Sequence, residues 1–233
     1  MSDPRDRPQR VGLLTPMPSE FAPVVKALSL QRTASGYTGA AGTIELVAAK
    51  TGVGTRLAAL ATERLLDAAP VDHVMVIGIA GGMGPSKVGD LIYPEVVVDK
   101  DSGAEYRPAP FFAVESKGRL VTHDDFDMKP AECEALVAAG FIAVDMETAA
   151  IAGVCERRGV KWSAVRAISD LVGVTPGDVI GLVNPDGTPN VGASIRYLVT
   201  KPWRIPKLVR LGMESQRAAK GAAEAAARLL HAS

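Results

Sequence analysis

The sequence predicts an α/β fold: a single domain with a mixed central β-sheet flanked by helices, and with a helical C-terminal extension. Apolar, strand-like runs alternate with helix-like segments through most of residues 10–170, an order that favours helices packed on the faces of a sheet. Residues 72–80 (DHVMVIGIA) form a nearly continuous β-branched, apolar run, which is typical of a central strand covered on both faces. The length of 233 residues suits one such domain.

The segments before this central strand supply two strands and two helices. Residues 10–15 form a short apolar run stopped by a proline, which predicts a buried strand. Residues 17–30 carry apolar side chains near helical spacing, with an early proline that a first helical turn tolerates. Residues 43–50 (TIELVAAK) predict a strand, and the alanine- and leucine-rich residues 56–69 predict a helix closed by a proline.

The segments after the central strand continue the alternation. Short apolar runs predict strands at 90–98, 118–122, 141–144 and 161–168. Helical patterning predicts helices at 129–139 and 146–158, and an alanine-rich helix at about 208–230. The chain therefore returns repeatedly to one sheet.

Both ends of the chain differ from this alternating part. Residues 1–9 are charged and proline-bearing, and we expect a disordered leader there, followed by one α/β domain over 10–172. Residues 173–233 are expected to form a loop rich in glycine, proline and aspartate, and then helices packed on the same domain. Within 201–231 there are seven Lys or Arg residues against two acids, which most simply indicates a solvated helix face.

Composition excludes several functional classes. Lys plus Arg number 26 and Asp plus Glu number 26, so no excess positive charge is present to neutralise nucleic-acid phosphates. The longest apolar run falls short of the roughly 18 residues of a membrane span. The two cysteines form no CxxC pair, and the three histidines have no metal-ligand spacing. We therefore expect a cytoplasmic protein that uses no metal.

Polar residues gather where the predicted strands end, which is where α/β sheets place functional groups. They are Glu20 after the first strand, the glycine run 78–84, the pair Asp145 and Glu147, and Arg166 with Ser169 and Asp170. Acids from three separate strand ends suit a reaction that needs one proton donor and one group to orient water.

Each candidate also has a structural alternative. Glu147 opens a helix, and the N–H groups at the helix N-terminus favour its ionised form. It could accept hydrogen bonds from a sugar diol, or it could simply cap the helix. Asp145 faces the same choice, and a structural role is favoured. Asp170 suits a general acid or a cap of the next turn. The glycine run lacks the following helix of a dinucleotide site and the GK[ST] of a P-loop, so it indicates close approach of a small ligand or a tight turn.

Five segments resemble the nucleoside phosphorylase/uridine phosphorylase superfamily, most closely its hydrolase branch, the 5′-methylthioadenosine/S-adenosylhomocysteine nucleosidases. The resemblance spans about residues 10–172 and is carried by GLLTPMPSE (12–20), TGVG (51–54), GIAGGMGPSKVGD (78–90), AVDMETAAIA (143–152) and VRAISD (165–170). It implies cleavage of the N-glycosidic bond of a purine nucleoside, of adenosine type and modified at the 5′ position. It also implies a homodimer with no metal or organic cofactor.

The resemblance assigns roles residue by residue. Asp170 corresponds to the acid that protonates the leaving base at N7, Glu20 to the carboxylate that activates water, and Arg166 to its cationic helper.

Further positions correspond to residues that hold the substrate in the family. Glu147 corresponds to the acceptor for the ribose hydroxyls, and Met146 packs beside the sugar. Phe126 falls where an aromatic ring stacks on the base, with the Asp127 backbone facing the base edge. The remaining residues expected to bind substrate are Ser169, Gly81 and Ile79.

Water is favoured over phosphate as the nucleophile. The family's phosphorylases carry an arginine in the first loop and another just before the glycine segment, but residues 16–25 have none and Val76 occupies the second place. Ile79 departs from the small hydroxyl residue common to both branches, so contacts to the nucleophile must differ. Residues 101–116 match poorly, which leaves the 5′ substituent open.

The part of the chain after residue 172 leaves alternatives open. It is somewhat similar to hopanoid-associated nucleoside phosphorylases, which suggests a larger, apolar 5′ substituent or a phosphate-dependent enzyme of a specialised pathway. A non-catalytic nucleoside-binding protein is the third possibility. The basic helical segment could cover a subunit interface or touch a membrane surface, although membrane contact is not expected.

Overall fold

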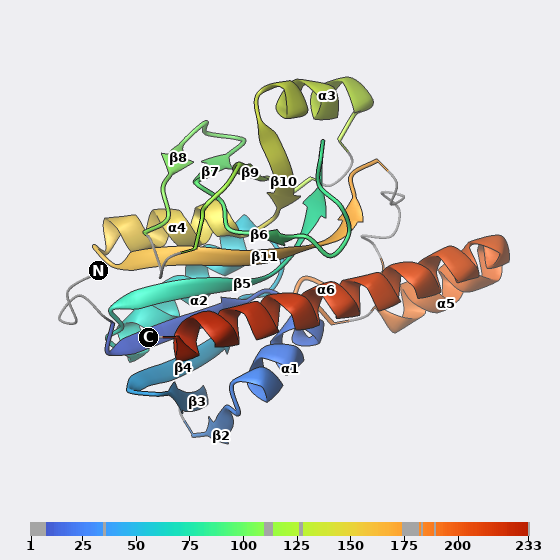
Figure 1. The fold of residues 1–233 in the computed structure, drawn as a ribbon. Coiled ribbons are helices and arrows are strands. Elements are labelled where there is room, and N and C mark those ends of the chain that lie inside the picture. The colour runs from blue at the N-terminus through green and yellow to red at the C-terminus, as the bar shows by residue number, and fades with distance from the viewer. Residues whose placement is uncertain are drawn as a thin grey trace.

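The computed structural model describes residues 8–34, 36–109, 114–125, 128–173, 182, 184–188 and 190–232. Eleven strands form one sheet, shown in Figure 1. Its centre is β5 (His73–Gly82), which runs parallel to β1 (Arg10–Thr15) on one side and to β11 (Lys161–Leu171) on the other. This arrangement confirms the predicted central strand.

Both sides of the sheet extend outward from this centre. Beside β1 lie β4 (Ile44–Lys50), which is parallel to it, and then the antiparallel β3 (Gly36–Ala41) and β2 (Gln31–Thr33). The end of β5 pairs antiparallel with β10 (Phe141–Asp145).

A second arm continues from β10. It contains, in order, β9 (Arg119–Thr122), β7 (Val96–Asp99) and β8 (Glu105–Tyr106). The short β6 (Leu91–Ile92) pairs antiparallel with β11. The sheet is therefore mixed, as predicted.

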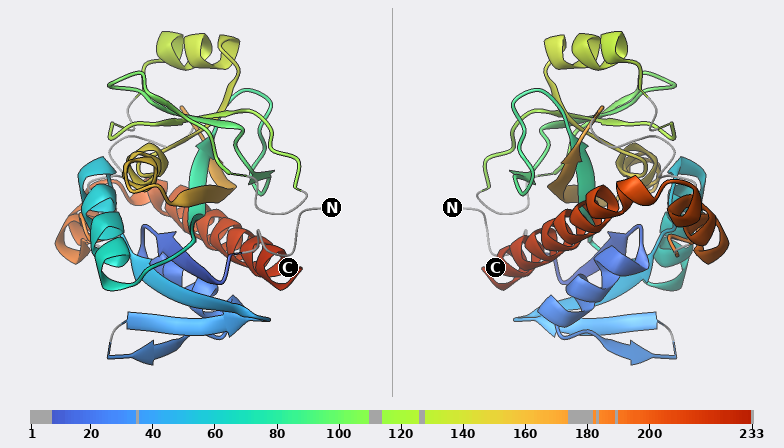
Figure 2. Two further views of the ribbon diagram at one scale, coloured as in Figure 1. Left: turned by 90° about the vertical axis from the view of Figure 1, so that its left-hand side faces the viewer. Right: turned by 90° about the vertical axis from the view of Figure 1, so that its right-hand side faces the viewer.

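Helices cover both faces of the sheet, as the turned views in Figure 2 show. The helices α1 (Pro18–Ala27) and α6 (Ile205–His231) pack against each other and against the sheet. The helices α2 (Thr55–Ala68) and α4 (Thr148–Arg157) form a second packed pair. The remaining helical segments are α3 (Pro130–Ala138), α5 (Val191–Thr200) and the short 3-10 turn η3 (Pro202–Arg204).

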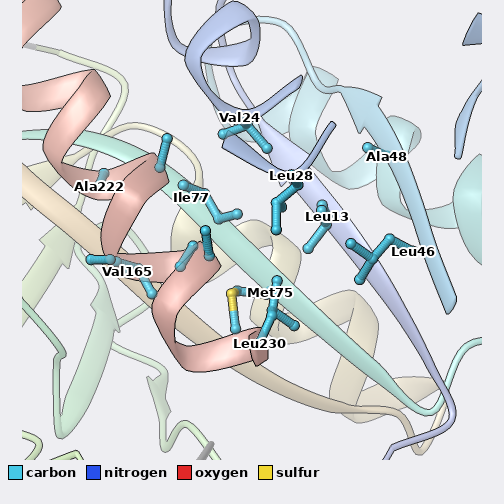
Figure 3. Close-up of a cluster of buried hydrophobic side chains, with 14 of the residues drawn as sticks. Leu13, Val24, Leu28, Leu46, Ala48, Met75, Ile77, Val165, Ala222 and Leu230 are labelled. Carbon is cyan, nitrogen blue, oxygen red and sulfur yellow. The ribbon is translucent and has the colours of Figure 1, made fainter. Parts of the chain in front are cut away.

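The central strand supplies side chains to two cores. Met75 and Ile77 of β5 pack with α1 and α6, in the cluster shown in Figure 3. Val74 and Val76 point the other way and pack with α2 and α4. Alternate residues of a strand face opposite sides of the sheet, so the uninterrupted apolar run of β5 reflects burial on both faces.

Several predicted boundaries were wrong, for identifiable reasons. The single strand expected at 90–98 is two strands, β6 and β7, separated by residues 93–95. Pro94 lies in this gap, and proline cannot donate to a strand ladder. The strands β2, β3 and β8 were not predicted, because β2 is exposed throughout and β8 has only two residues. The strand expected at 161–168 continues to Leu171.

The ends of the chain are described only in part. Residues 1–7 of the expected leader, and residues 174–181, 183 and 189 of the expected loop, lie outside the described residues. The division of the chain at residue 172 stays a prediction. Among the helices that the structure describes, none is long and apolar enough to cross a membrane.

Candidate active site

Arg166 on β11 is the centre of the candidate site. Its side chain is fully buried, and its Nη2 lies 2.5 Å from Asp145 Oδ2 and 3.6 Å from Glu147 Oε2. Nη2 and Nε donate to Thr148 Oγ1 at 2.8 and 3.2 Å, and Nη1 donates to the carbonyl oxygen of Ile79 at 3.4 Å. Because a guanidinium donates in a fixed plane, these partners together fix its position.

Asp145 anchors this guanidinium from the end of β10. Its carboxylate also accepts hydrogen bonds from the Thr122 hydroxyl at 2.6 Å, from the Thr148 hydroxyl, and from the backbone N–H groups of Glu147 and Thr148 at 3.4 and 3.3 Å. These N–H groups lie at the start of α4, where a helix leaves donors without partners. The contacts support the structural role that the sequence favoured for Asp145.

Glu20 reaches the same buried region from the first turn of α1. Its Oε1 accepts from the backbone N–H of Ile79 at 2.8 Å, and its Oε2 accepts from the backbone N–H of Met17 at 3.0 Å. Burial raises the pKa of Glu20, and the charge of Arg166 and the two N–H donors offset this only in part. The backbone of Ile79 therefore links Glu20, through its N–H, to Arg166, through its carbonyl.

Gly78 is the residue that lets Arg166 and Glu20 approach β5. A Cβ built at this position would overlap Arg166 Nη1 and lie 3.1 Å from Glu20 Oε1 and 3.3 Å from Pro16 Cδ. The glycine run of the sequence thus has a packing reason at Gly78, which is close approach of two buried charged side chains.

Alanine at this position is expected to disturb the site. Gly78→Ala should lower turnover by about ten-fold or more, because a 1 Å shift of a positioned group far from the chemistry can cost up to ~10²-fold. Steady-state kinetics measure the loss. The matched control is Gly221→Ala in α6, where an added Cβ meets nothing within 4 Å. Equal activity of the two variants would contradict the packing argument.

Glu147 lies just before α4 and faces Arg166. Its Oε1 accepts from the backbone N–H of Gly54 at 3.0 Å, at the start of α2. Burial raises the pKa of Glu147 to about 8; Arg166 opposes this change, and Asp145 adds to it. The sequence predicts an ionised carboxylate here from the N–H groups of the helix N-terminus, whereas burial in the fold acts in the opposite direction and raises the pKa.

This pKa gives the protein a pH-dependent stability. A glutamate with an ordinary pKa near 4.5 when unfolded and about 8 when folded takes up a proton on folding between these values. The destabilising contribution of Glu147 is therefore absent at low pH and grows as the pH rises from about 4.5 to about 8. Glu147→Gln should therefore raise the free energy of unfolding more at pH 8.5 than at pH 5.0.

The expected difference between the two pH values is at least about 1.4 kcal/mol, which corresponds to one pKa unit. Urea unfolding of the wild type and of the variant measures it. Glu95→Gln, at an exposed position, serves as the control and should behave alike at both pH values. A Glu147→Gln effect that does not change with pH would show that the carboxyl titrates alike in both states.

Asp170 lies at a β-bulge near the end of β11. The register between β11 and β5 shifts just before Asp170, which then pairs with Gly81. Ser169 Oγ lies 2.5 Å from Asp170 Oδ1, and both side chains are buried. Bulges redirect side chains and are frequent beside active sites. Gly81, the partner of Asp170 on β5, is two positions from Ile79. The backbone of Ile79 contacts both Glu20 and Arg166.

The structure therefore connects most of the predicted site residues. Arg166 lies 3.6 Å from Glu147, and the Ile79 backbone links Arg166 to Glu20 because its carbonyl accepts from Arg166 and its N–H donates to Glu20. These contacts use the backbone of Ile79, so its apolar side chain leaves them intact. Met146 is half-buried beside Glu147 in the chain. Two further predicted residues, Phe126 and Asp127, lie outside the described residues.

Some contributors were not predicted. Thr148 and the backbone N–H groups of Met17 and Gly54 hold the three charged side chains. Thr148 follows Glu147 directly in the sequence, so its position beside a predicted site residue could have marked it as a member of the site. The N–H donors carry no sequence pattern, because any residue except proline supplies one.

The buried charges do not balance. Three carboxyl groups, of Glu20, Asp145 and Glu147, surround the guanidinium of Arg166. The raised pKa values of Glu20 and Glu147 follow chiefly from burial, and the neighbouring carboxyl groups add to the effect. Such a site can exchange protons near neutral pH and accept hydrogen bonds from hydroxyl groups. In the part of the chain that the structure describes, no cluster of His, Cys, Asp and Glu could hold a metal ion.

Known proteins share much of this sequence. The sequence model of the phosphorylase superfamily matches residues 10–117 and 113–180. A 5′-methylthioadenosine/S-adenosylhomocysteine nucleosidase of Marinomonas sp. (strain MWYL1) is 32% identical over 200 residues, covering 70% of this chain and 86% of that protein. A nucleosidase of the same name from Geobacillus kaustophilus is 34% identical over 166 residues, covering 58% of this chain and 70% of that protein.

Solved structures share the fold at lower identity. Futalosine hydrolase of Helicobacter pylori superposes with a TM-score of 0.71 at 20% identity, covering 97% of this chain and 98% of that one. The 5′-methylthioadenosine/S-adenosylhomocysteine nucleosidase of Neisseria meningitidis, in complex with methylthio-immucillin-A, gives a TM-score of 0.72 at 20% identity, covering 97% and 100%. These likenesses support the predicted fold class along almost the whole chain.

Proposed function

Because this chain belongs to the phosphorylase superfamily, we propose that it is a nucleosidase, a hydrolase that cleaves the N-glycosidic bond of a 5′-modified, adenosine-type purine nucleoside. The observation that carries this proposal is the buried arrangement of Glu20 and Glu147 with Arg166, together with Asp170, which is buried on the same strand as Arg166 and pairs with Gly81 of β5. The nucleosidases of similar sequence support the same reaction class.

The chemistry of the bond explains why this set of residues suits it. Glycosidic cleavage passes through an oxocarbenium-like state, so the leaving group needs a proton and the sugar needs a nucleophile on its opposite face. Asp170 supplies the proton to N7 of the purine. Glu20, whose pKa burial raises, takes a proton from water as the water attacks the anomeric carbon. Arg166 donates to the carbonyl of Ile79, whose N–H in turn holds Glu20.

The sugar and the base are held by the remaining residues. Glu147 accepts hydrogen bonds from the 2′ and 3′ hydroxyls, and these donors favour its ionised form on binding. Met146 packs beside the sugar, and Ser169 positions Asp170. Gly81 and the Ile79 backbone line the site on β5.

Electrostatics favours water over phosphate. A phosphate dianion needs a cation to bind it, but Arg166 is already bound to Asp145 at 2.5 Å and lies 3.6 Å from Glu147. A dianion that enters a buried region without a cation to pair it pays a large desolvation cost. Val76, at the place where the family's phosphorylases carry a second arginine, is fully buried in the apolar core. A neutral water molecule meets no such barrier.

Product analysis tests the proposal. The purified protein should release adenine from methylthioadenosine, adenosylhomocysteine or 5′-deoxyadenosine in phosphate-free buffer, with a free ribosyl product. Release that strictly requires phosphate would overturn hydrolysis in favour of phosphorolysis. Adenine binding by calorimetry without any product would instead indicate a non-catalytic nucleoside-binding protein.

We further propose that the enzyme is a cytoplasmic homodimer that binds no nucleic acid. The family likeness supports the dimer, and the balanced charge of 26 basic and 26 acidic residues supports the absence of nucleic-acid binding. Light scattering of the purified chain measures the mass. A monomer at working concentration would contradict the dimer.

A further inference from the structure

The long helix α6 has two halves with different surroundings. All of its buried residues lie at or beyond Ala218, where alanines pack against β5 and β11. Residues 205–217 contain no buried residue at all. This half extends past the end of the sheet, as Figure 1 shows. We call this half, together with Trp203 before it, the α6 overhang (residues 203–217).

The overhang carries a concentration of exposed apolar side chains. Four of the seven large apolar residues exposed in the described part of the chain lie within it: Trp203 at 72%, Ile205 at 39%, Val209 at 57% and Met213 at 49%. Ile205, Val209 and Met213 are spaced four residues apart, so they form one ridge along the helix. Contiguous exposed apolar surface of this kind usually marks a binding surface.

Positive charge accompanies this ridge. Residues 201–224 contain six Lys or Arg residues and two acids, Glu214 and Glu224, which pair with Arg210 and Lys220, in a chain whose net charge is zero. Arg210, on the helix beside the ridge, is 80% exposed although its Nε lies 2.8 Å from Glu214 Oε1. Lys220 is 73% exposed. An exposed tryptophan, an apolar ridge and flanking cations are the combination found on helices that lie in the interface of a bilayer.

We infer that the α6 overhang docks onto the surface of a membrane that contains anionic lipids. The ridge enters the boundary between headgroups and acyl chains, Trp203 lies at headgroup level, and the cations contact lipid phosphates. This reverses the expectation, drawn from the sequence, that the chain makes no membrane contact.

Two other partners fit the surface less well. A second copy of the chain, related by two-fold symmetry, would bring the same positive ridge against itself, and like charges would repel. Nucleic-acid contacts depend on phosphate neutralisation and leave an apolar ridge without a role. An anionic bilayer satisfies both the charge and the exposed apolar side chains.

Tryptophan fluorescence provides a direct test on the full chain. The protein has two tryptophans, and Trp162 is buried at 2% exposure, so the response of an exposed indole reports Trp203. Adding vesicles of phosphatidylcholine mixed with phosphatidylglycerol should shift the emission to shorter wavelength, and sedimentation should pellet the protein with them. Vesicles of phosphatidylcholine alone should bind at least five-fold less, since each cation near an anionic surface contributes about five-fold.

Variants separate the surface from the rest of the protein. The double variant Val209→Asp, Met213→Asp should bind mixed vesicles at least ten-fold more weakly, while Leu60→Asp on α2, an apolar residue of similar exposure at 44%, should bind normally. Circular dichroism checks that both variants remain folded, and neither assay contains substrate, so the outcome is independent of the proposed hydrolysis.

Three results would overturn the inference. The first is that the double variant binds mixed vesicles as well as the wild type does. The second is that the wild type binds both vesicle types equally. The third is that the wild type is a dimer and the double variant is a monomer. The last would assign the ridge to a second copy of the chain.

Discussion

Asp170→Asn is expected to lower the turnover of the nucleoside by about 10²–10⁴-fold, the usual contribution of a general acid. Asparagine preserves the size of the side chain but has no acidic proton to give to the purine. A neutral purine leaves poorly without that proton, so the loss should appear in kcat rather than in the binding of adenine.

Single-turnover kinetics and calorimetric binding of adenine separate the two effects. Ser169→Ala is the informative companion, because Ser169 Oγ lies 2.5 Å from Asp170 Oδ1 and only positions it. It should retain most of the activity lost in Asp170→Asn. Asp67→Asn, at an exposed position on α2, should behave as the wild type. Turnover of Asp170→Asn near the wild-type value would refute the assignment of the proton donor.

Arg166→Met should produce the largest loss of stability. The substitution leaves Glu20, Asp145 and Glu147 buried together without the cation they surround. Removing one partner of a buried ion pair typically costs about 3–5 kcal/mol. For a chain of this size each kcal/mol corresponds to roughly 2–4 °C in Tm. Activity should be lost as well, because Arg166 holds the Ile79 backbone.

The pH dependence identifies the cause of this loss. Without Arg166 the pKa values of Glu20 and Glu147 rise further, so the folded variant must take up protons, and its deficit should be smaller at pH 5 than at pH 8. Thermal unfolding at both pH values measures it. Arg158→Met is the control, because Arg158 pairs with Glu63 and Asp67 on the surface, where solvent screens the charges. An equal loss in both variants would contradict the electrostatic explanation.

The site illustrates a conflict between stability and function. Glu20 and Glu147 both have pKa values raised by burial, which means that the fold holds these carboxyl groups away from the water that would stabilise their ionised form. Ligand hydroxyl groups and the attacking water provide the hydrogen bonds that ionised carboxylates need. Variants such as Glu147→Gln should therefore gain stability at alkaline pH while losing affinity for the sugar.

Local pattern was enough to predict most of the fold. The strands β1, β5 and β9 and the helix α2 lie within one or two residues of their predicted ranges, because apolar runs and prolines act over a few neighbouring positions. The predictions failed at residues 90–98, where one apolar run is divided into two strands: β6 pairs with β11, and β7 pairs with β9. Strand pairing of this kind depends on distant segments.

The candidate residues were recognisable from their motifs, but their state was not. The sequence alone predicted that Glu20 and Glu147 follow strands and that Arg166 and Asp170 lie in or at the end of another strand of the same sheet. Only the tertiary structure decided that β10 runs antiparallel to β5, so that the end of β10 brings Glu147 to Arg166 on β11. Only the tertiary structure decided that Gly54 donates to Glu147, that Gly78 makes room for Arg166, and that burial raises the pKa of Glu147. Local helix geometry predicts an ionised Glu147, whereas desolvation by residues far away in the chain predicts the opposite. Burial and long-range charge are sums over the whole fold, so no window of sequence contains them.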